Sequence, residues 1–406
     1  MASATAARRR PARARSSIGS TVIYLDYNAT TPLCPEARAA MLPYLGAEFG
    51  NPSSVHRLGS RARVAVENAR AQVARLIGAR ASEIVFTGGG TEANNLALFG
   101  VLALFGVATA RDGALVTTTI EHSSVLASAT RLEADGRPVH RIGVDRTGRV
   151  DLDGLRTALQ HRVALVSVGW ANNEIGTIQP IAEIAALCRA AGALLHVDAV
   201  QAVGKIPVVA EETDLLSLSA HKLGGPKGVG ALWVRGGVAL EPRVFGGGQE
   251  RGRRSGTENV TGIVGFGAAC GVAVADDVTC TRTTELRERL WEGLATAIGD
   301  VRRNSPRDYC LPNTLNVCIA GVRGEALVAG ADIEDVAIST GSACAAGAAE
   351  PSHVLRALGL TDDEARDGVR FSLGRETTVG EIDRAIDVVA ALVAQVRRVP
   401  RAVAYA

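Results

Sequence analysis

Residues 180–222 read PIAEIAALCRAAGALLHVDAVQAVGKIPVVAEETDLLSLSAHK, and this stretch decides the fold. Pro180 opens a helical repeat that ends at Gly192, the usual placing of proline and glycine at the two ends of a helix. Two short apolar runs follow, at 194–197 and 215–218. Short strands that alternate with helices predict a parallel sheet covered by helices on both faces.

The same alternation extends on both sides of this stretch. A helical repeat covers 57–77, and further predicted strands lie at 84–86, 115–118, 163–168 and 229–234. After about residue 275 the pattern changes to a helix from 283, a β-type run at 314–319 and further helices. We therefore predict an α/β fold whose large domain, residues 37–274, holds a mainly parallel sheet between helices. A smaller α+β domain is expected to combine residues 22–36 with residues 275–406.

The composition excludes several classes of protein. The 406 residues carry 44 Lys+Arg against 42 Asp+Glu, a net charge of +2 that gives no support for nucleic-acid binding. The apolar runs at 97–108 and 263–275 are shorter than the ~20 residues of a membrane span, so no membrane insertion is expected. Seven cysteines without a CxxC pair argue against a disulfide framework or a cysteine-based metal site, and they favour a reducing, cytoplasmic location.

Residues 1–21 differ from the rest of the chain. They hold five arginines and no acidic residue, and they lack the apolar core of a secretory signal. We interpret them as a disordered basic tail. An organellar transit peptide has the same composition, and that alternative stays open.

Polar clusters follow five of the predicted strands. Ligands bind at the carboxyl ends of strands in an open parallel sheet, so the five clusters predict one crevice lined from several loops. The clusters are residues 87–91, 121–122, 172–174, 198–201 and 219–222.

Three of these positions together suggest pyridoxal phosphate. The glycine run before Thr91 lets the backbone of a helix N-terminus approach a phosphate, although a plain tight turn has the same sequence. Lys222 is one of only three lysines, with Lys205 and Lys227, and a desolvated lysine can hold a carbonyl cofactor as a Schiff base. Asp198 can pair with the pyridine nitrogen. The alternatives are a surface lysine and a capping aspartate.

Three further residues are candidates for the functional site, and each also has a purely structural interpretation. Cys344 lies in a run of small residues, which suits a nucleophile on a mobile loop better than a packed structural thiol. Arg370 lies between apolar residues, where it can bind a carboxylate or form an ion pair within its domain. His122 can stack on a flat ring, move a proton, or have neither role.

The motifs taken together resemble those of a known family. The chain is similar to the cysteine desulfurases of the iron–sulfur-assembly and nitrogen-fixation type, pyridoxal-phosphate enzymes of aminotransferase class V. The resemblance extends from about residue 22 to 397 in collinear order. Its motifs are residues 24–32, 50–56, 91–95, 121–122, 172–176, 197–201, 219–222, 225–228, 246–251, 254–257, 341–344, 350–356 and 369–375.

The resemblance implies a role for each matching residue. Lys222 is the Schiff-base lysine, Asp198 the partner of the pyridine nitrogen, Gln201 the partner of the phenolic oxygen, and His122 the ring stacked on the cofactor. Asn173 contacts the cofactor and, with Arg370, orients the substrate carboxylate. Cys344 is the cysteine that becomes a persulfide. The implied phosphate cradle consists of Gly90, Thr91, Ser219 and His221, with Thr257 reaching the phosphate of a neighbouring subunit.

The resemblance also implies the fold and the reaction. A fold-type I transferase is expected, acting as a homodimer that converts L-cysteine to L-alanine and hands the sulfur to an acceptor or scaffold protein. A selenocysteine lyase, or another class V enzyme of a dedicated pathway, is the alternative enzyme. A non-enzymatic sulfur-relay scaffold is disfavoured because Lys222 and Cys344 are both present. Trp170 and the alanine-rich run 345–349 depart from the usual family pattern, and they leave the sulfur acceptor open.

Overall fold

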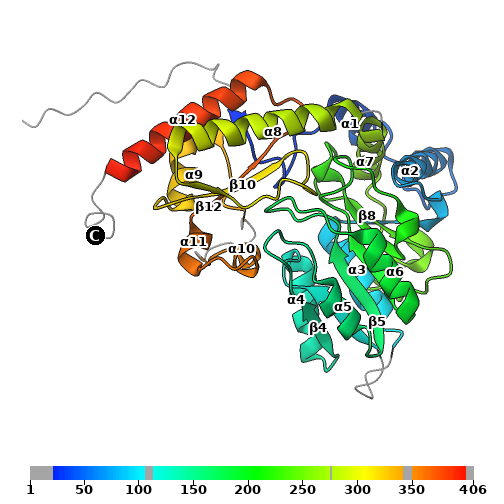
Figure 1. The fold of residues 1–406 in the computed structure, drawn as a ribbon. Helices are drawn as coiled ribbons and strands as arrows, with labels where there is room; N and C mark the ends of the chain where they lie inside the picture. The colour runs from blue at the N-terminus through cyan, green and yellow to red at the C-terminus, as the bar shows by residue number, and fades with distance from the viewer. Residues whose placement is uncertain (1–21, 106–112, 275–276, 342–349, 399–406) are drawn as a thin grey trace, which may run out of the picture.

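The computed structural model describes residues 22–105, 113–274, 277–341 and 350–398. Figure 1 shows two groups of elements, one around a large sheet and one around a small sheet that α8 and α12 cross side by side. The chain enters the small group first, because its first strand, β1 (Ile23–Tyr24), pairs in parallel with β11 (Val336–Ala337). The N-terminal segment therefore begins in the small group.

The large sheet has seven strands in the order β2-β8-β7-β6-β5-β3-β4. Its parallel pairs confirm the mainly parallel sheet expected from the sequence, but β8 runs antiparallel to both β7 and β2. Only the short segment 220–229 joins β7 to β8, and a parallel crossover needs a dozen or more residues. The strands are β2 (Ile84–Thr87), β3 (Ala114–Thr118), β4 (Val139–Ile142), β5 (Val163–Gly169), β6 (Leu194–Asp198), β7 (Leu215–Ser219) and β8 (Gly230–Val234).

Helices cover both faces of this sheet, as the alternation of its side chains requires. Ile84 and Phe86 belong to one buried cluster with α2, α5, α6 and α7, while Val85 belongs to the opposite cluster with α3 and α4. The helices are α1 (Pro35–Met41), α2 (Arg57–Leu76), α3 (Gly90–Leu102), α4 (Ser123–Ala134), α5 (Leu152–Ala158), α6 (Ile181–Ala191) and α7 (Val260–Val274). Short 3-10 turns are η1 (Leu42–Leu45), η2 (Ala81–Glu83), η3 (Ala210–Glu212), η4 (Ala220–Lys222) and η5 (Gln249–Gly252).

The second group has a core of its own. The antiparallel strands β12-β10-β9 pack Leu315, Val317 and Phe371 against α8, α9 and α12. Its elements are α8 (Asp277–Ile298), β9 (Val301–Arg303), β10 (Thr314–Ile319), α9 (Gly324–Ile333), α10 (His353–Ala357), α11 (Asp362–Arg366), β12 (Gly368–Ser372) and α12 (Val379–Arg398). Helix α8 begins at Asp277, six residues before the predicted start at 283. The prediction began too late because residues 277–282 carry no apolar repeat. The domain boundaries near residues 36 and 275 remain a prediction.

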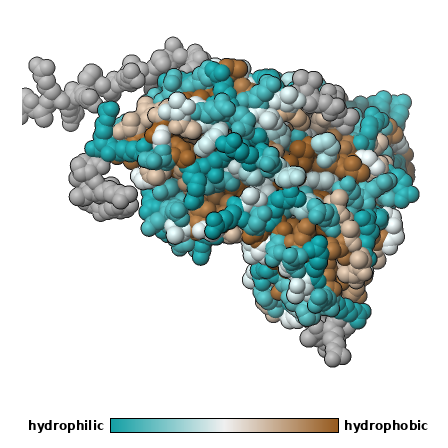
Figure 2. Space-filling model, viewed as in Figure 1, coloured by the Kyte–Doolittle hydropathy of each residue, from teal (hydrophilic) through white to brown (hydrophobic). Residues whose placement is uncertain are grey.

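The surface in Figure 2 is mixed. Hydrophilic residues cover most of the face shown, and hydrophobic residues appear mainly in its right half, over the large sheet and its helices. Within the described ranges, no helix is long and apolar enough to cross a membrane.

Candidate active site

A cavity of about 540 Å³ lies at the carboxyl ends of the parallel strands. Clusters that follow β3, β5, β6 and β7 contribute side chains to it, as does the start of α3. Ten residues singled out from the sequence line this one cavity: Gly90, Thr91, His122, Asn173, Asp198, Gln201, Ser219, His221, Lys222 and Arg370. The predicted crevice therefore exists as a single space.

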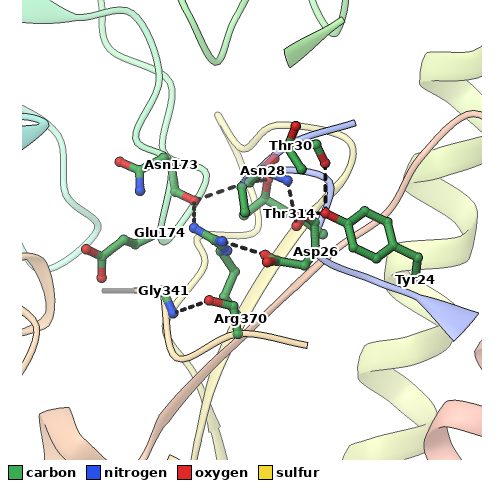
Figure 3. Close-up of polar contacts among 12 residues, drawn as sticks. Tyr24, Asp26, Asn28, Thr30, Asn173, Glu174, Thr314, Gly341 and Arg370 are labelled. Carbon is green, nitrogen blue, oxygen red and sulfur yellow. Dashed lines mark hydrogen bonds and ion pairs between the residues drawn. The ribbon is translucent and has the colours of Figure 1, made fainter. Parts of the chain in front are cut away.

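Asn28, which lies between the two groups of elements, is a hub of this cavity. Its backbone oxygen accepts hydrogen bonds from Lys222 Nζ at 2.6 Å and from Gln201 Nε2 at 3.0 Å. Its side-chain amide donates to Thr314 Oγ1 at 2.8 Å and to the backbone oxygen of Asn173 at 3.0 Å (Figure 3). Asn28 thus links both groups, but the sequence analysis gave it no role because nothing local marks its contacts.

Lys222 closes the 3-10 turn that follows β7. Besides its bond to Asn28, its amine donates to the backbone oxygen of Ala29 at 2.8 Å. The neighbouring His221 ring holds Thr30 Oγ1 at 3.1 Å. Burial and the positive charge of Lys222 lower the pKa of His221 to about 4, so this imidazole is neutral near pH 7.

Asp198 ends β6 with both carboxylate oxygens engaged. Oδ1 accepts the backbone N–H of Val200 at 2.9 Å, and Oδ2 accepts Asn94 Nδ2 at 2.6 Å. Asn94 also donates to Ser124 Oγ at 2.9 Å, while its own Oδ1 is buried and has no partner among the described residues. Two N–H donors therefore fix the orientation of the carboxylate. The sequence analysis missed Asn94, although it lies in the quoted run 91–95.

The glycine run forms the opening of α3. Gly89 has φ +154°, a conformation that residues with a side chain rarely adopt, and Gly90 is the first helical residue. A Cβ on Gly90 would lie 2.8 Å from Val200 Cγ2, so a side chain would fill the space where the backbone faces the cavity. The N–H groups of the first turn and the positive end of the helix dipole suit an anion here.

His122 is the N-cap of α4. Its Nδ1 accepts the backbone N–H of Ser124 at 3.1 Å, so the neutral ring carries its proton on Nε2. Next to it, burial raises the pKa of Glu121 to about 8, although Thr118 Oγ1 donates to its carboxylate at 2.6 Å. Glu121 lines the cavity beside His122, and the sequence analysis assigned no role to its carboxyl.

Arg370 lies in the middle of β12 with only 2% of its surface exposed. Its Nη2 lies 2.6 Å from Asp26 Oδ1, and its Nη1 donates to the backbone oxygen of Asn173 at 3.1 Å (Figure 3). Its Nε is buried and has no partner among the described residues. The ion pair within the chain, one of the two alternatives, is therefore present, and one N–H of the guanidinium still faces no acceptor.

Of the predicted site residues that the structure describes, Thr257 is exposed and does not line the cavity. Its segment is held by Arg254, whose Nε lies 2.8 Å from Glu92 Oε1, while Glu92 Oε2 accepts the backbone N–H of Gly88 at 2.8 Å. Cys344 lies outside the described residues, between Gly341, which lines the cavity, and residue 350.

Comparison with known proteins decides the family. Residues 23–385 match the family described as aminotransferase class V. The chain belongs to this family. A cysteine desulfurase of Cereibacter sphaeroides is 50% identical over 380 residues, covering 92% of this chain and 96% of that protein. The cysteine desulfurase IscS of Dictyoglomus turgidum is 44% identical over 380 residues, covering 93% and 96%. A solved structure of a NifS-like protein superposes with a TM-score of 0.87 at 36% identity, covering 92% of this chain and all of the other.

These matches confirm the predicted class V fold with its mostly parallel sheet. Members of this family generally depend on pyridoxal phosphate, and the cavity of this class V chain fits that group. The opening of α3 is a cradle that a Cβ on Gly90 would fill, Asp198 offers a fixed carboxylate, and Lys222 brings an amine to the same space. The cavity volume also lies within the usual range of ligand pockets, about 300–1,000 Å³.

Proposed function

We propose that this chain is a pyridoxal-phosphate-dependent cysteine desulfurase, which converts L-cysteine to L-alanine and transfers the sulfur to Cys344. One observation carries the proposal. A single cavity gathers Lys222, Asp198 and Arg370 from three distant stretches, in a chain that shares 50% identity with a named cysteine desulfurase. Amine, carboxylate and guanidinium are the groups that a reaction on an amino acid bound to this cofactor needs.

The cofactor, when bound, withdraws electrons from the amino-acid substrate. In the proposal, Lys222 would hold the cofactor through its amine and would move the proton at the substrate Cα. Asp198 would pair with the pyridine nitrogen. Gly90, Thr91, Ser219 and His221 would hold the phosphate, and Gln201 would donate to the phenolic oxygen. His122 would stack on the ring and could move a proton.

Arg370 and Asn173 orient the substrate in the proposal. The buried Nε–H of Arg370 is an arm of the guanidinium that the ion pair with Asp26 leaves for a carboxylate. The Asn173 side chain lines the cavity, and its backbone oxygen holds both Arg370 and Asn28 in place. Substrate binding at this point would set the direction of the Cα–H and Cβ–S bonds.

Sulfur transfer is assigned to Cys344. Its thiolate attacks the substrate sulfur, so that one S–S bond forms while the Cβ–S bond breaks and its electron pair stays on carbon. A proton then completes the methyl group of alanine. The persulfide is passed to an acceptor or scaffold protein. The six described cysteines are free thiols, which fits the reducing cytoplasm where we place the protein.

We also propose a homodimer in which Thr257 contacts the phosphate bound by the partner subunit. The exposed position of Thr257 supports this, because its hydroxyl does not reach the cavity of its own chain. Mixing Thr257→Ala with Lys222→Ala protomers should give hybrids with one intact and one doubly impaired site. Hybrids in which each site carries a single defect would show instead that Thr257 serves its own subunit.

The lysine count gives the experiment that tests the function. Lys222→Ala should lose the visible absorbance of the bound cofactor and the adduct trapped by borohydride, whereas exposed Lys227→Ala should keep both. Wild type should release alanine from L-cysteine, and L-selenocysteine should be compared as substrate. A borohydride adduct retained in Lys222→Ala would overturn the lysine assignment, and no alanine from wild type would overturn the activity.

A further inference from the structure

A second lysine amine lies behind the cavity. Lys205 follows β6 and is partly exposed, and its Nζ donates to Gln201 Oε1 at 2.6 Å and to Asn28 Oδ1 at 2.9 Å. The residues that supply these two oxygens are both buried. Lys205 also lines a separate cavity of about 150 Å³, which Lys222 lines as well. The proposed mechanism gives it no role.

The surroundings of Lys205 are unusual for a cation. Its two hydrogen-bond acceptors are amide oxygens, and the charged groups that act on it most strongly are Lys222 and Arg370, both positive. Burial and these charges lower the pKa of Lys205 well below its ordinary value. Around it, Cys280 donates to its backbone oxygen from α8, and the small cavity also includes Arg375 and Glu376 after β12.

The contacts of Lys205 fix two side-chain amides. The Lys205 amine donates in both contacts, so it selects the carbonyl side of Gln201 and of Asn28. Gln201 must then direct its NH2 group away from Lys205, and one of those N–H bonds reaches the backbone oxygen of Asn28 at 3.0 Å. That same oxygen accepts Lys222 Nζ at 2.6 Å. One continuous network therefore joins Lys205, Gln201, Asn28 and Lys222.

The network has a consequence for the cavity that Gln201 lines. The second N–H of its amide is available to an acceptor there, and a flipped amide would present an oxygen instead. An anionic oxygen is stabilised by an N–H donor and repelled by a carbonyl oxygen. An N–H donor on that oxygen also makes an additional proton on a nitrogen bound at Lys222 less favourable.

We propose that Lys205 is a positioning residue, which holds Gln201 with its N–H side toward the cavity. The inference rests on the proposed function, because Gln201 is taken to face the phenolic oxygen of the cofactor. Lys205 touches neither substrate nor cofactor, and it acts through Gln201 and Asn28. Its loss should leave the bond between Lys222 and the cofactor intact but change the pH at which that bond takes up a proton.

The test is a spectroscopic pH titration of the holoenzyme. In Lys205→Met the midpoint of the visible absorbance change should rise by about one pH unit, because a donor that stabilises the anionic phenolic oxygen is lost. Lys205→Gln keeps an N–H donor and should shift the midpoint less. Exposed Lys227→Met is the matched control and should titrate as wild type.

Action through Gln201 makes a further prediction. In a Gln201→Leu background, Lys205→Met should shift the midpoint by less than half of its effect in wild type, because the two residues form one network. Midpoints unchanged in both Lys205 variants, or full shifts in the Gln201→Leu background, would overturn the proposal. A purely structural role would lower thermal stability and leave the midpoint unchanged. Failure of wild type to form any adduct at Lys222 would instead overturn the proposed function.

Discussion

Arg370 and Asp26 form an ion pair that joins the N-terminal segment to strand β12, with 2.6 Å between Nη2 and Oδ1. Asp26 also forms a β-bridge with Ser372, so both partners are held by backbone pairing as well. The pair occupies one arm of the guanidinium and leaves the buried Nε–H without a partner among the described residues. Arg370 is therefore aligned in advance of the carboxylate that it is proposed to bind.

This alignment predicts the effect of Arg370→Lys. Lysine keeps the charge but cannot supply the fork of a guanidinium, so KM for L-cysteine should rise about 10- to 100-fold, the equivalent of one charge-assisted hydrogen bond. Affinity for the cofactor should change little. Steady-state kinetics and cofactor titration measure the two effects, and Arg302→Lys, at an exposed position of β9, is the control. An unchanged KM would remove Arg370 from substrate binding.

A second buried ion pair predicts a large effect on stability. Arg70 of α2 binds Glu250 through two contacts, at 2.6 Å and 2.9 Å, and Glu250 also accepts the backbone N–H of Phe86. Arg70→Met leaves a buried carboxylate without its cation, and the free energy of unfolding should fall by about 3–5 kcal/mol. Arg61→Met, which breaks the exposed pair with Glu48, should cost less than about 1 kcal/mol.

The double variant completes this test. Adding Glu250→Gln to Arg70→Met removes the unpaired charge, so denaturant unfolding should recover part of the lost stability. Equal losses in the single and double variants would show that Arg70 stabilises the fold by packing, since its guanidinium also lies 4.7 Å from the centre of the Phe86 ring.

Glu121 predicts a pH dependence of stability. Its folded pKa, about 8, is raised above the ordinary value of 4.5, so between these pH values the folded protein binds more protons than the unfolded chain. The contribution of Glu121 to the free energy of unfolding is complete below pH 4.5. It is lost as the pH rises toward 8, by up to about 1.4 kcal/mol per pH unit. Glu121→Gln should flatten this decline.

Unfolding of cofactor-free protein at a series of pH values measures the effect. His196 acts in the opposite direction at lower pH, because burial lowers its pKa to about 4. Stability falls as the pH drops from 6.5 toward 4, since the unfolded chain takes up a proton there while the folded His196 stays neutral. The comparison of wild type with Glu121→Gln is therefore decisive between pH 6.5 and 8. Parallel stability curves in that range would show that Glu121 is ionised in the folded protein.

The sequence predicted the parts of the site that lie next to strands. Asp198 and Lys222 each follow an apolar run, and parallel strands bring their carboxyl ends together whatever the loops between them. Asn28 and Asp26 gave no such signal, because the partners Asn173, Arg370 and Ser372 lie 145 to 346 residues away and only the packed fold unites them. Lys205 was known from the sequence only as one of three lysines. Strand β8 runs antiparallel because its connection from β7 is too short for a crossover. The pattern of apolar residues does not reveal the direction of a strand.

The last prediction concerns Cys344 and separates cofactor binding from sulfur transfer. Burial raises the pKa of Cys188 to about 12, and it also raises those of Cys270, Cys310 and Cys318. A thiol that stays protonated is a poor nucleophile, so these four are unsuited to take sulfur. The small residues around Cys344 in the sequence lack the apolar partners that bury a thiol.

Cys344→Ala should therefore still bind the cofactor and change its absorbance when L-cysteine is added. Alanine release should fall to a trace, and no persulfide should be trapped on the protein, because the substrate sulfur has no thiolate to attack it. Cys188→Ala is the matched control and should keep its activity at a cost of about 1–2 kcal/mol in stability. Alanine assays and mass spectrometry of alkylated persulfides measure both outcomes. Near-normal alanine release by Cys344→Ala, or a persulfide mapped to another cysteine, would contradict the assignment.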